Sequence, residues 1–271
     1  MITVLTGASA GIGAAVALDL AKRGRQLVLV GRSPERLAAV AQGVADVTGR
    51  APDTVHADFA MLNDVRRLAG ELLDRYERID ALVNNAGVMT PRRERTPDGH
   101  ELMIQVNHLA PFLLTNLLLD RLKDSSARVV TTSSRAARTG RLDPDDLSRD
   151  RRRWSGWLQY GDTKQANALF TVGLARRGLA ATSLHPGVLK TGFAAGTLYM
   201  KFLTVVPGLT EPPEAGASRI AHLVCEADGV DHPGRFFSKN VPARVPKTMS
   251  DPELAETLWQ ATLTATGLPS N

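Results

Sequence analysis

The chain has 271 residues, of which 43% are hydrophobic and 23% are charged, so it is a folded globular protein and not a disordered or collagen-like one. Its charge is basic, with 33 Lys and Arg residues against 28 Asp and Glu residues. The net charge of +5 is compatible with nucleic acid, an anionic membrane or phosphate ligands as partners. It is also compatible with a charge that serves only to keep the protein soluble. The single cysteine, Cys225, excludes an intramolecular disulfide and suits a reducing compartment.

Signals for secretion or membrane insertion are not apparent. The chain opens MITVLTG, without a basic segment followed by an apolar stretch, so we expect no signal peptide. The longest run without a charged residue, 102–119, contains Asn107, His108 and Asn116, and a spanning helix would place these polar groups in hydrocarbon. We therefore expect a cytoplasmic protein with no membrane span.

Short β-rich runs alternate along the chain with longer helical patterns. The expected strands are residues 2–5, 26–30, 54–57, 81–84, 128–132 and 182–185, with a short seventh at 234–238. The expected helices are residues 11–23, 34–48, 63–76, 100–122 and 157–177, and a last helix that starts at Asp251 and Pro252. This order predicts one α/β domain over residues 1–271, a doubly wound Rossmann-type parallel sheet of about seven strands with helices on both faces.

Two segments interrupt the regular alternation. Residues 139–159 form a charged insertion, rich in Arg and Asp, that includes Arg151, Arg152 and Arg153. The arginine run is compatible with an anionic membrane or an acidic substrate, although nearby aspartates favour a solvated insertion; the flanking tryptophans either cap a pocket or pack on the insertion. Residues 192–213 are apolar but punctuated by Gly and Pro, so we expect a substrate lid there.

A glycine-rich turn lies between the first expected strand and the first expected helix. Residues 6–13 read TGASAGIG, with the spacing GxxxGxG instead of the GxGxxG of the general dinucleotide fingerprint. Glycines let the backbone N–H groups approach a pyrophosphate, and the helix N-terminus favours the anion. We expect a nucleotide site here, and the alternative is a plain βα turn that needs glycine for packing.

The end of the second strand decides the type of cofactor. An acidic residue there would bind the ribose of NAD, whereas a basic residue suits the 2′-phosphate of NADP. The strand is followed by Arg32, with no Asp or Glu beside it, and a guanidinium matches a phosphate. The sequence predicts NADP(H) in preference to NAD(H), unless Arg32 is merely a solvated side chain.

Tyr160 has a lysine, Lys164, four residues further along an expected helix. Residues at this spacing share one helix face, so the ammonium can lie beside the phenol. A nearby cation favours the phenolate and lowers the pKa of a tyrosine from its usual value of about 10. The pair is a candidate for acid–base catalysis, and a surface pair without chemistry is the alternative.

Together these motifs resemble the short-chain dehydrogenase/reductase family over essentially the whole chain. The turn TGxxxGxG, then NNAG at 84–87, Asn107, the adjacent Ser133 and Ser134, and Tyr160 with Lys164 occur in the order of that family. The last third, with HPGV at 185–188, PEAGA at 213–217 and GRFFS at 234–238, is similar to the retinol-dehydrogenase-like branch.

The resemblance implies a role for each catalytic residue. Tyr160 would be the general acid in reduction and the base in oxidation. Lys164 would bind the nicotinamide ribose and lower the pKa of Tyr160. Ser134 would orient and polarise the substrate carbonyl. Asn107 would hold a water that connects Lys164 to solvent, at a local break in its helix.

The resemblance also implies which residues contact the cofactor. Those after the fourth strand would line the adenosine ribose, those after the third the adenine, and those after the sixth the nicotinamide. The full expected set is Gly7, Ser9, Ala10, Gly11, Ile12, Gly13, Arg32, Asp58, Phe59, Asn85, Ala86, Gly87, Tyr160, Lys164, Pro186, Gly187, Val188 and Thr191. Many NADP-preferring relatives carry a basic residue where this chain has Ala10, which leaves Arg32 as the main support for NADP(H).

The leading hypothesis is thus an NADP(H)-dependent oxidoreductase that interconverts an alcohol and a carbonyl on a hydrophobic small molecule. The alternative is a catalytically weak protein that senses NADP(H) and regulates a partner. The six histidines lack metal-ligand spacing, and no hydrolase or nucleic-acid-binding motif is apparent, so we expect neither a metal nor a nucleic-acid partner. Helices 100–122 and 157–177 are candidates for a homodimer interface unless the insertion covers them.

Overall fold

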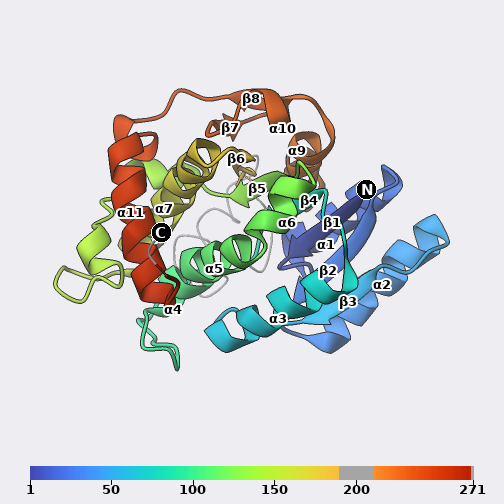
Figure 1. The fold of residues 1–271 in the computed structure, drawn as a ribbon, viewed down its shortest axis with the longest axis horizontal. Coiled ribbons are helices and arrows are strands. Elements are labelled where there is room, and N and C mark those ends of the chain that lie inside the picture. The colour runs from blue at the N-terminus through green and yellow to red at the C-terminus, as the bar shows by residue number, and fades with distance from the viewer. Residues whose placement is uncertain (189–209, 270–271) are drawn as a thin grey trace.

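A single eight-stranded sheet forms the centre of the computed structural model, which describes residues 1–188 and 210–269 (Figure 1). The strand order is β3-β2-β1-β4-β5-β6-β7-β8. The strands are β1 Ile2–Thr6, β2 Gln26–Gly31, β3 Asp53–His56, β4 Ala81–Asn84, β5 Arg128–Thr132, β6 Ala180–His185, β7 Phe236–Ser238 and β8 Val241–Pro242. Strands β1 to β7 are parallel, which confirms the doubly wound sheet, and β8 adds a short antiparallel hairpin that was not predicted.

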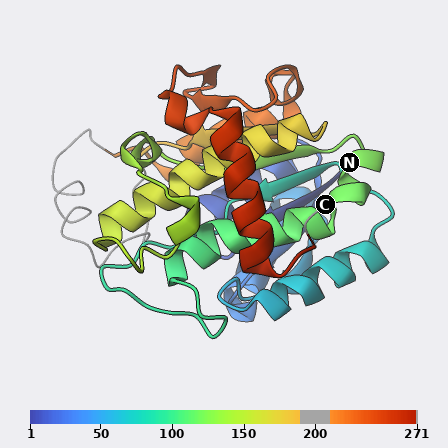
Figure 2. The same ribbon diagram turned by 60° about the vertical axis from the view of Figure 1, so that its left-hand side comes forward.

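Helices cover both faces of the sheet (Figures 1 and 2). Helices α1 Gly11–Lys22, α2 Pro34–Thr48 and α9 Pro213–Cys225 pack on one face, and α3 Leu62–Arg75, α5 Ala110–Leu117 and α7 Gly156–Arg176 pack on the other. Val and Leu side chains of the strands are buried on both faces, together with Thr and Ser side chains. The order of strands reverses between β1 and β4, and the carboxyl ends of parallel strands at such a point form the usual ligand crevice.

The predicted helix over 100–122 is not continuous. It comprises α4 Leu102–Ile104, a π-helical turn Gln105–Leu109, α5, and α6 Leu119–Asp124. Pro111 has no N–H to donate to the carbonyl of Asn107 four residues earlier, so the regular ladder fails there. The break thus coincides with Asn107, and π-turns of this kind are frequent at functional sites.

Helix α9 was not predicted, because the preceding Gly/Pro-rich segment was read as a loop up to Pro213. Its sequence nevertheless carries helix signals: Pro213 occupies the first turn with Glu214, and the buried positions recur at helical spacing. Helix α9 packs along α1, and the backbone of Val224 near its end accepts a hydrogen bond from Arg25, just after α1. The two helices therefore run in parallel, with both N-termini at the carboxyl edge of the sheet.

The last helix, α11 Pro252–Thr266, lies across α7 and α5 (Figure 2). Its Trp259 is 4% exposed and packs against Phe112 and Phe170, with ring centroids 4.8 and 5.9 Å away. The faces of α5 and α7 beneath it are the ones that we considered for a homodimer interface. They are covered by the chain's own last helix, and Leu142 and Leu147 of the insertion pack against the same part of α7.

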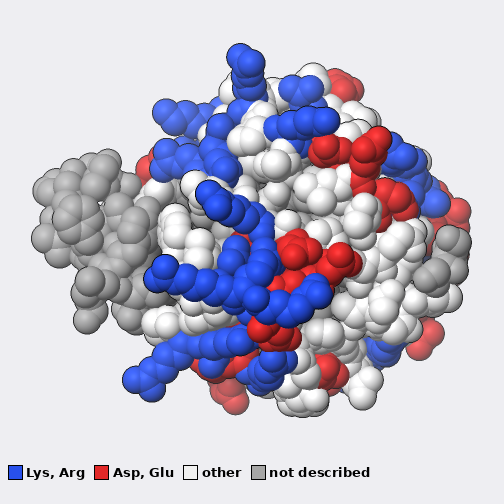
Figure 3. Space-filling model, turned by 90° about the vertical axis from the view of Figure 1, so that its left-hand side faces the viewer, with Lys and Arg blue, Asp and Glu red and all other residues white. Residues whose placement is uncertain are grey.

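The charged insertion is held by interactions within the chain. Arg152 forms an ion pair with Asp146 at 2.9 Å, and Arg151 donates to the backbone of Asp145 at 2.6 Å. Asp150 pairs with Arg93 and, at 2.5 Å, with Arg95. Figure 3 shows basic and acidic side chains interleaved on this face. Most of these charges have partners within the protein.

Two expectations fall outside the described residues. The predicted lid over 192–213 is described only from residue 210, and Thr191 lies in the same gap. Within residues 1–188 and 210–269, no helix is both long enough and apolar enough to cross a membrane.

Candidate active site

The glycine-rich turn packs so tightly that side chains are excluded from it. Gly7 has φ +68°, and a Cβ on Gly13 would lie 2.0 Å from the carbonyl oxygen of Gly7. Helix α1 begins after Ala10 with no side-chain cap and no acidic residue in its first turn. The backbone N–H groups of that turn therefore remain available to an anion, and the turn fits the pyrophosphate of a dinucleotide.

The segment after β4 docks on the same turn. The hydroxyl of Thr6 accepts hydrogen bonds from the backbone N–H groups of Asn85 and Ala86 at 3.0 and 3.1 Å. The side chain of Asn85 donates to the carbonyl of Thr6 at 3.1 Å. A Cβ on Gly7 would lie 2.7 Å from the Cα of Ala86, so the glycine permits this contact. Thr6 thus organises two segments of the candidate cofactor site.

The side chain of Asn107 connects three parts of the site. Its Oδ1 accepts a hydrogen bond from the backbone N–H of Val88 at 2.7 Å, and its Nδ2 donates to the Val88 carbonyl at 3.0 Å. The same Nδ2 donates to the hydroxyl of Thr163 at 3.1 Å. A Cβ on Gly87 would lie 3.3 Å from Oδ1 of Asn107 and 3.6 Å from Nζ of Lys164. Asn107 therefore fixes the backbone that borders Lys164.

Helix α7 brings Tyr160 and Lys164 to the end of β5. The Nζ atom of Lys164 lies 5.5 Å from the centre of the Tyr160 ring and donates to the backbone carbonyl of Thr132 at 3.1 Å. Ser155 caps the start of this helix by accepting a hydrogen bond from Leu158 at 3.3 Å. The phenol, the ammonium and the strand end are thus in one place.

The adjacent serines after β5 have different environments. Ser133 is buried, and its hydroxyl donates to the backbone carbonyl of Lys164 at 2.6 Å. The hydroxyl of Ser134 accepts from the backbone N–H of Ala136 at 3.2 Å and forms a hydrogen bond with Tyr160. Ser133 therefore supports the lysine backbone, and Ser134 is the serine that contacts the phenol.

Burial sets the protonation states of the site. Although Tyr160 keeps some exposure to solvent, desolvation raises its pKa to about 12, against the opposing effect of the Ser134 hydrogen bond. Desolvation also lowers the pKa of Lys164 to about 8. The resemblance implies a lowered pKa for Tyr160, but in the protein itself desolvation dominates. At neutral pH the phenol is protonated and can act as a proton donor.

Asp58 and Phe59, which were expected to flank an adenine, differ in burial. One carboxylate oxygen of Asp58 accepts from the backbone N–H of Ala60 at 3.0 Å, and the side chain is only partly buried. The side chain of Phe59 is 5% exposed and belongs to the hydrophobic core around α3. Only the backbone of Phe59 remains to contact a ligand, because its ring is committed to packing.

Two arginines flank the start of α2. Arg32 directly follows β2, is exposed, and makes no side-chain hydrogen bond or ion pair with any described residue. Arg36 lies in the first turn of α2, is also exposed, and likewise has no such side-chain partner among the described residues. Arg36 was not among the predicted cofactor contacts, although the Ser33–Pro34 helix start places it one turn after Arg32. A Cβ on Gly31 would lie 3.1 Å from Ser9, so this strand end borders the glycine-rich turn.

The end of β6 contributes the last expected segment. Pro186 is buried, and its carbonyl accepts a hydrogen bond from Arg219 of α9 at 2.6 Å. Gly187 has φ +115°, a conformation that favours glycine, and the carbonyl of Val188 accepts from the backbone of Glu211 at 2.8 Å. These contacts hold the segment at the carboxyl edge of the sheet, next to Ser134.

The comparisons with known proteins show which family the chain resembles. The family model described as short chain dehydrogenase matches residues 1–199. A Streptomyces protein provisionally named daunorubicin C-13 ketoreductase is 42% identical over 97% of this chain and 92% of its own. Retinol dehydrogenase 13 of Homo sapiens is 36% identical over 98% of this chain and 84% of its own. The crystal structure of a provisionally assigned short chain dehydrogenase from Escherichia coli CFT073, in complex with NADPH, has a TM-score of 0.73 at 28% identity and covers 89% of this chain and 96% of that chain.

Proposed function

The chain belongs to the short-chain dehydrogenase family and is an alcohol/carbonyl oxidoreductase, and from this premise we propose that it uses NADP(H) on a hydrophobic small molecule. One observation carries the mechanism: the Lys164 ammonium lies 5.5 Å from the Tyr160 ring, and Ser134 forms a hydrogen bond with the same phenol. A proton donor, a hydrogen-bond donor and a cation thereby surround one position at the end of β5. A substrate carbonyl oxygen is the group that this set would bind.

Each residue has a distinct role in this proposal. When bound, the nicotinamide supplies or accepts the hydride at the substrate carbon. Tyr160 donates its phenolic proton to the carbonyl oxygen during reduction, and Ser134 donates a hydrogen bond to that oxygen. Lys164 stabilises the phenolate that forms. Because the phenol is protonated at neutral pH, it is in the state needed to donate a proton when a carbonyl is reduced.

The NADP(H) preference is supported by the two exposed arginines at the start of α2. Arg32 and Arg36 offer guanidinium groups without carboxylate partners among the described residues, and a 2′-phosphate would supply one. Related structures were solved with NADPH and with NADP. Glu35 also lies near this position and accepts a hydrogen bond from Ser33 at 2.9 Å. The negative charge of Glu35 opposes the binding of a phosphate in part.

The substrate class follows from the relatives and from the apolar sequence near the site. One relative is named for a ketone and another for an alcohol. We propose a polyketide-like, isoprenoid, steroid or aromatic substrate with a ketone or aldehyde. The test is a panel of lipophilic and polar carbonyl compounds with NADPH, followed by absorbance. Turnover confined to lipophilic members supports the proposal, whereas a tight NADPH complex without turnover of any member would favour the sensor hypothesis.

A further inference from the structure

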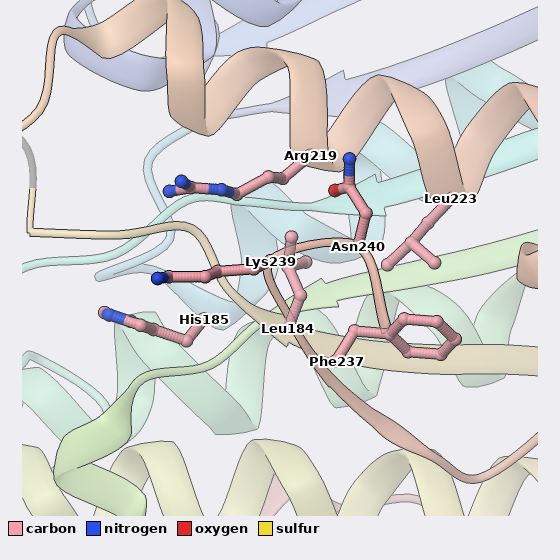
Figure 4. A pocket seen from close by; sticks show the side chains of 7 residues that line it. All are labelled: Leu184, His185, Arg219, Leu223, Phe237, Lys239 and Asn240. Atoms are coloured by element: carbon pink, nitrogen blue, oxygen red, sulfur yellow. The ribbon is translucent and has the colours of Figure 1, made fainter. Parts of the chain in front are cut away.

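A narrow recess opens beside the end of β6, between α9 and the turn that joins β7 to β8 (Figure 4). Its interior has no space for a water molecule, so only its mouth, which is open to solvent, can admit a ligand. Leu184, Leu223 and Phe237 form its apolar side, whereas the polar ends of His185, Arg219 and Lys239 gather on the opposite side (Figure 4). The recess is therefore basic at its mouth and apolar behind.

His185 is the least expected member of this group. His185 is only 8% exposed, yet its Nδ1 atom has no hydrogen-bond partner within the described part of the chain. Burying a polar nitrogen without a partner costs free energy, so such an atom usually has a ligand, a water or a functional role. The sequence predicted no ligand for His185. The orphaned nitrogen and the neighbouring charges indicate that an anion binds beside it.

Of the cations around His185, only Arg219 is held by contacts of its side chain with described residues. Arg219 donates to the carbonyl of Pro186 at 2.6 Å and pairs with Glu211 at 2.5 Å, which orients its guanidinium and neutralises one charge. Lys239 has no ion pair among the described residues, and its φ of +53° belongs to the tight turn between β7 and β8. Arg135, directly after Ser134, adds a second uncompensated charge that acts on His185. The net field at the mouth of the recess is positive.

We propose that the mouth of this recess is an anion subsite, at which Lys239, Arg219 and His185 bind a carboxylate or phosphate group. Lys239 supplies a point charge, Arg219 an oriented guanidinium, and His185 the N–H of a neutral imidazole. The group comes either from a substrate or from the cofactor, since the segment Pro186–Gly187 begins next to His185. A dissolved phosphate ion has the same chemistry and serves as the probe.

The direct test uses inorganic phosphate and thermal unfolding at constant ionic strength. The background is Arg32→Ala, which removes one of the other expected phosphate contacts; Arg36 and the glycine-rich turn remain, so the subsite is identified by the further variants. We expect phosphate, relative to chloride, to raise the unfolding midpoint of this protein. Adding Lys239→Gln should weaken the apparent phosphate affinity about tenfold, the loss of one charge-assisted hydrogen bond. His185→Leu should weaken it as well, and Lys247→Gln, which alters a lysine exposed to 87% on another segment, should not.

The outcomes separate the subsite from the proposed function, because phosphate binding needs no turnover. Absence of a phosphate effect in the Arg32→Ala protein, or an effect that Lys239→Gln leaves unchanged, would overturn the subsite. If Lys239→Gln raises the Kd for NADPH, the site binds a phosphate of the cofactor. If NADPH affinity is unaffected but acidic carbonyl compounds lose turnover in Lys239→Gln while neutral ones keep it, the site binds a substrate carboxylate.

Discussion

The Nε of Arg149 donates to the carboxylate of Asp162 at 2.8 Å, and the two side chains are only 6% and 0% exposed. Asp162 lies two residues after Tyr160 on α7, and Arg149 lies in the charged insertion with a φ of +51°. The other oxygen of Asp162 accepts from the backbone of Arg141 at 2.8 Å. The insertion is therefore anchored on the turn of α7 that presents the phenol.

Replacing Arg149 by methionine should destabilise the protein. Asp162 would then be a buried carboxylate without its closest cation, since Arg152 approaches only to 3.7 Å. The expected loss is about 3–5 kcal/mol in the free energy of unfolding, measured by urea denaturation. The double variant Arg149→Met/Asp162→Leu should recover much of this loss. A double variant no more stable than Arg149→Met would show that the pair's charge is not the cause.

The contact between α7 and α11 depends on a glycine. A Cβ on Gly173 would lie 2.8 Å from Cε3 of Trp259, so Gly173→Ala should push the indole away from Phe112 and Phe170. We expect a loss of about 1–3 kcal/mol in urea denaturation, with a red-shifted tryptophan emission. Gly70→Ala is the matched control, because a Cβ at that helical position meets nothing within 4 Å. An unaltered emission in Gly173→Ala would contradict the packing.

Acid should destabilise the protein partly through His108. This histidine is fully buried, donates to or accepts from the hydroxyl of Thr262 at 3.1 Å, and has its pKa lowered by desolvation to about 4. The unfolded chain binds the proton near pH 6.5, so stability from this group is complete above pH 6.5 and is lost as the pH falls toward 4. The loss is about 3 kcal/mol.

The variant His108→Leu tests this account through the slope of stability against pH, not through its absolute value. Urea unfolding between pH 7 and pH 4 should show a shallower decline in His108→Leu than in the unmodified protein. His232→Leu, at a partly exposed site, serves as the control. Parallel declines in all three proteins would assign the acid sensitivity to other groups.

Cofactor preference should respond to Arg32 and Arg36, at the start of α2, but not to an arginine at the far end of that helix. Arg32→Ala and Arg36→Ala should each raise the Kd for NADPH about tenfold and leave the Kd for NADH nearly unchanged, because each removes a charge-assisted contact to the 2′-phosphate. Arg50→Ala, an exposed arginine just past the end of α2, is the control. Equal losses for NADPH and NADH would contradict a role in recognising the phosphate.

The sequence predicted the parallel sheet well because buried strands and capped helices leave local signals. The helix start at Asp251 and Pro252 is an example: its carboxylate accepts from the N–H of Glu253 at 2.9 Å. Helix α9 was missed because the prolines before it suggested a loop. The hairpin strand β8 is two residues long and contains Pro242, so it has no periodicity to detect.

The candidate site was only partly accessible to the same reasoning. Motifs identified Tyr160 and Lys164 because both lie on one helix at a fixed spacing. The partners of Thr6 and Asn107, and the burial of Phe59, depend on contacts between segments far apart in the chain, which no local pattern encodes. His185 and Lys239 are 54 positions apart and meet only because β6 and β7 are neighbours in the sheet.

Tyr160→Phe, assayed for NADPH oxidation with a carbonyl compound that the unmodified protein reduces, tests the central mechanism most directly. Tyr76→Phe is the control, because its hydroxyl donates to Asp53 at 2.5 Å in another part of the protein. We expect Tyr160→Phe to lower kcat at least about 100-fold while its affinity for NADPH is unchanged. Tyr76→Phe should keep the turnover of the unmodified protein. Turnover in Tyr160→Phe within a few-fold of the unmodified protein would contradict the assignment of Tyr160 as the proton donor.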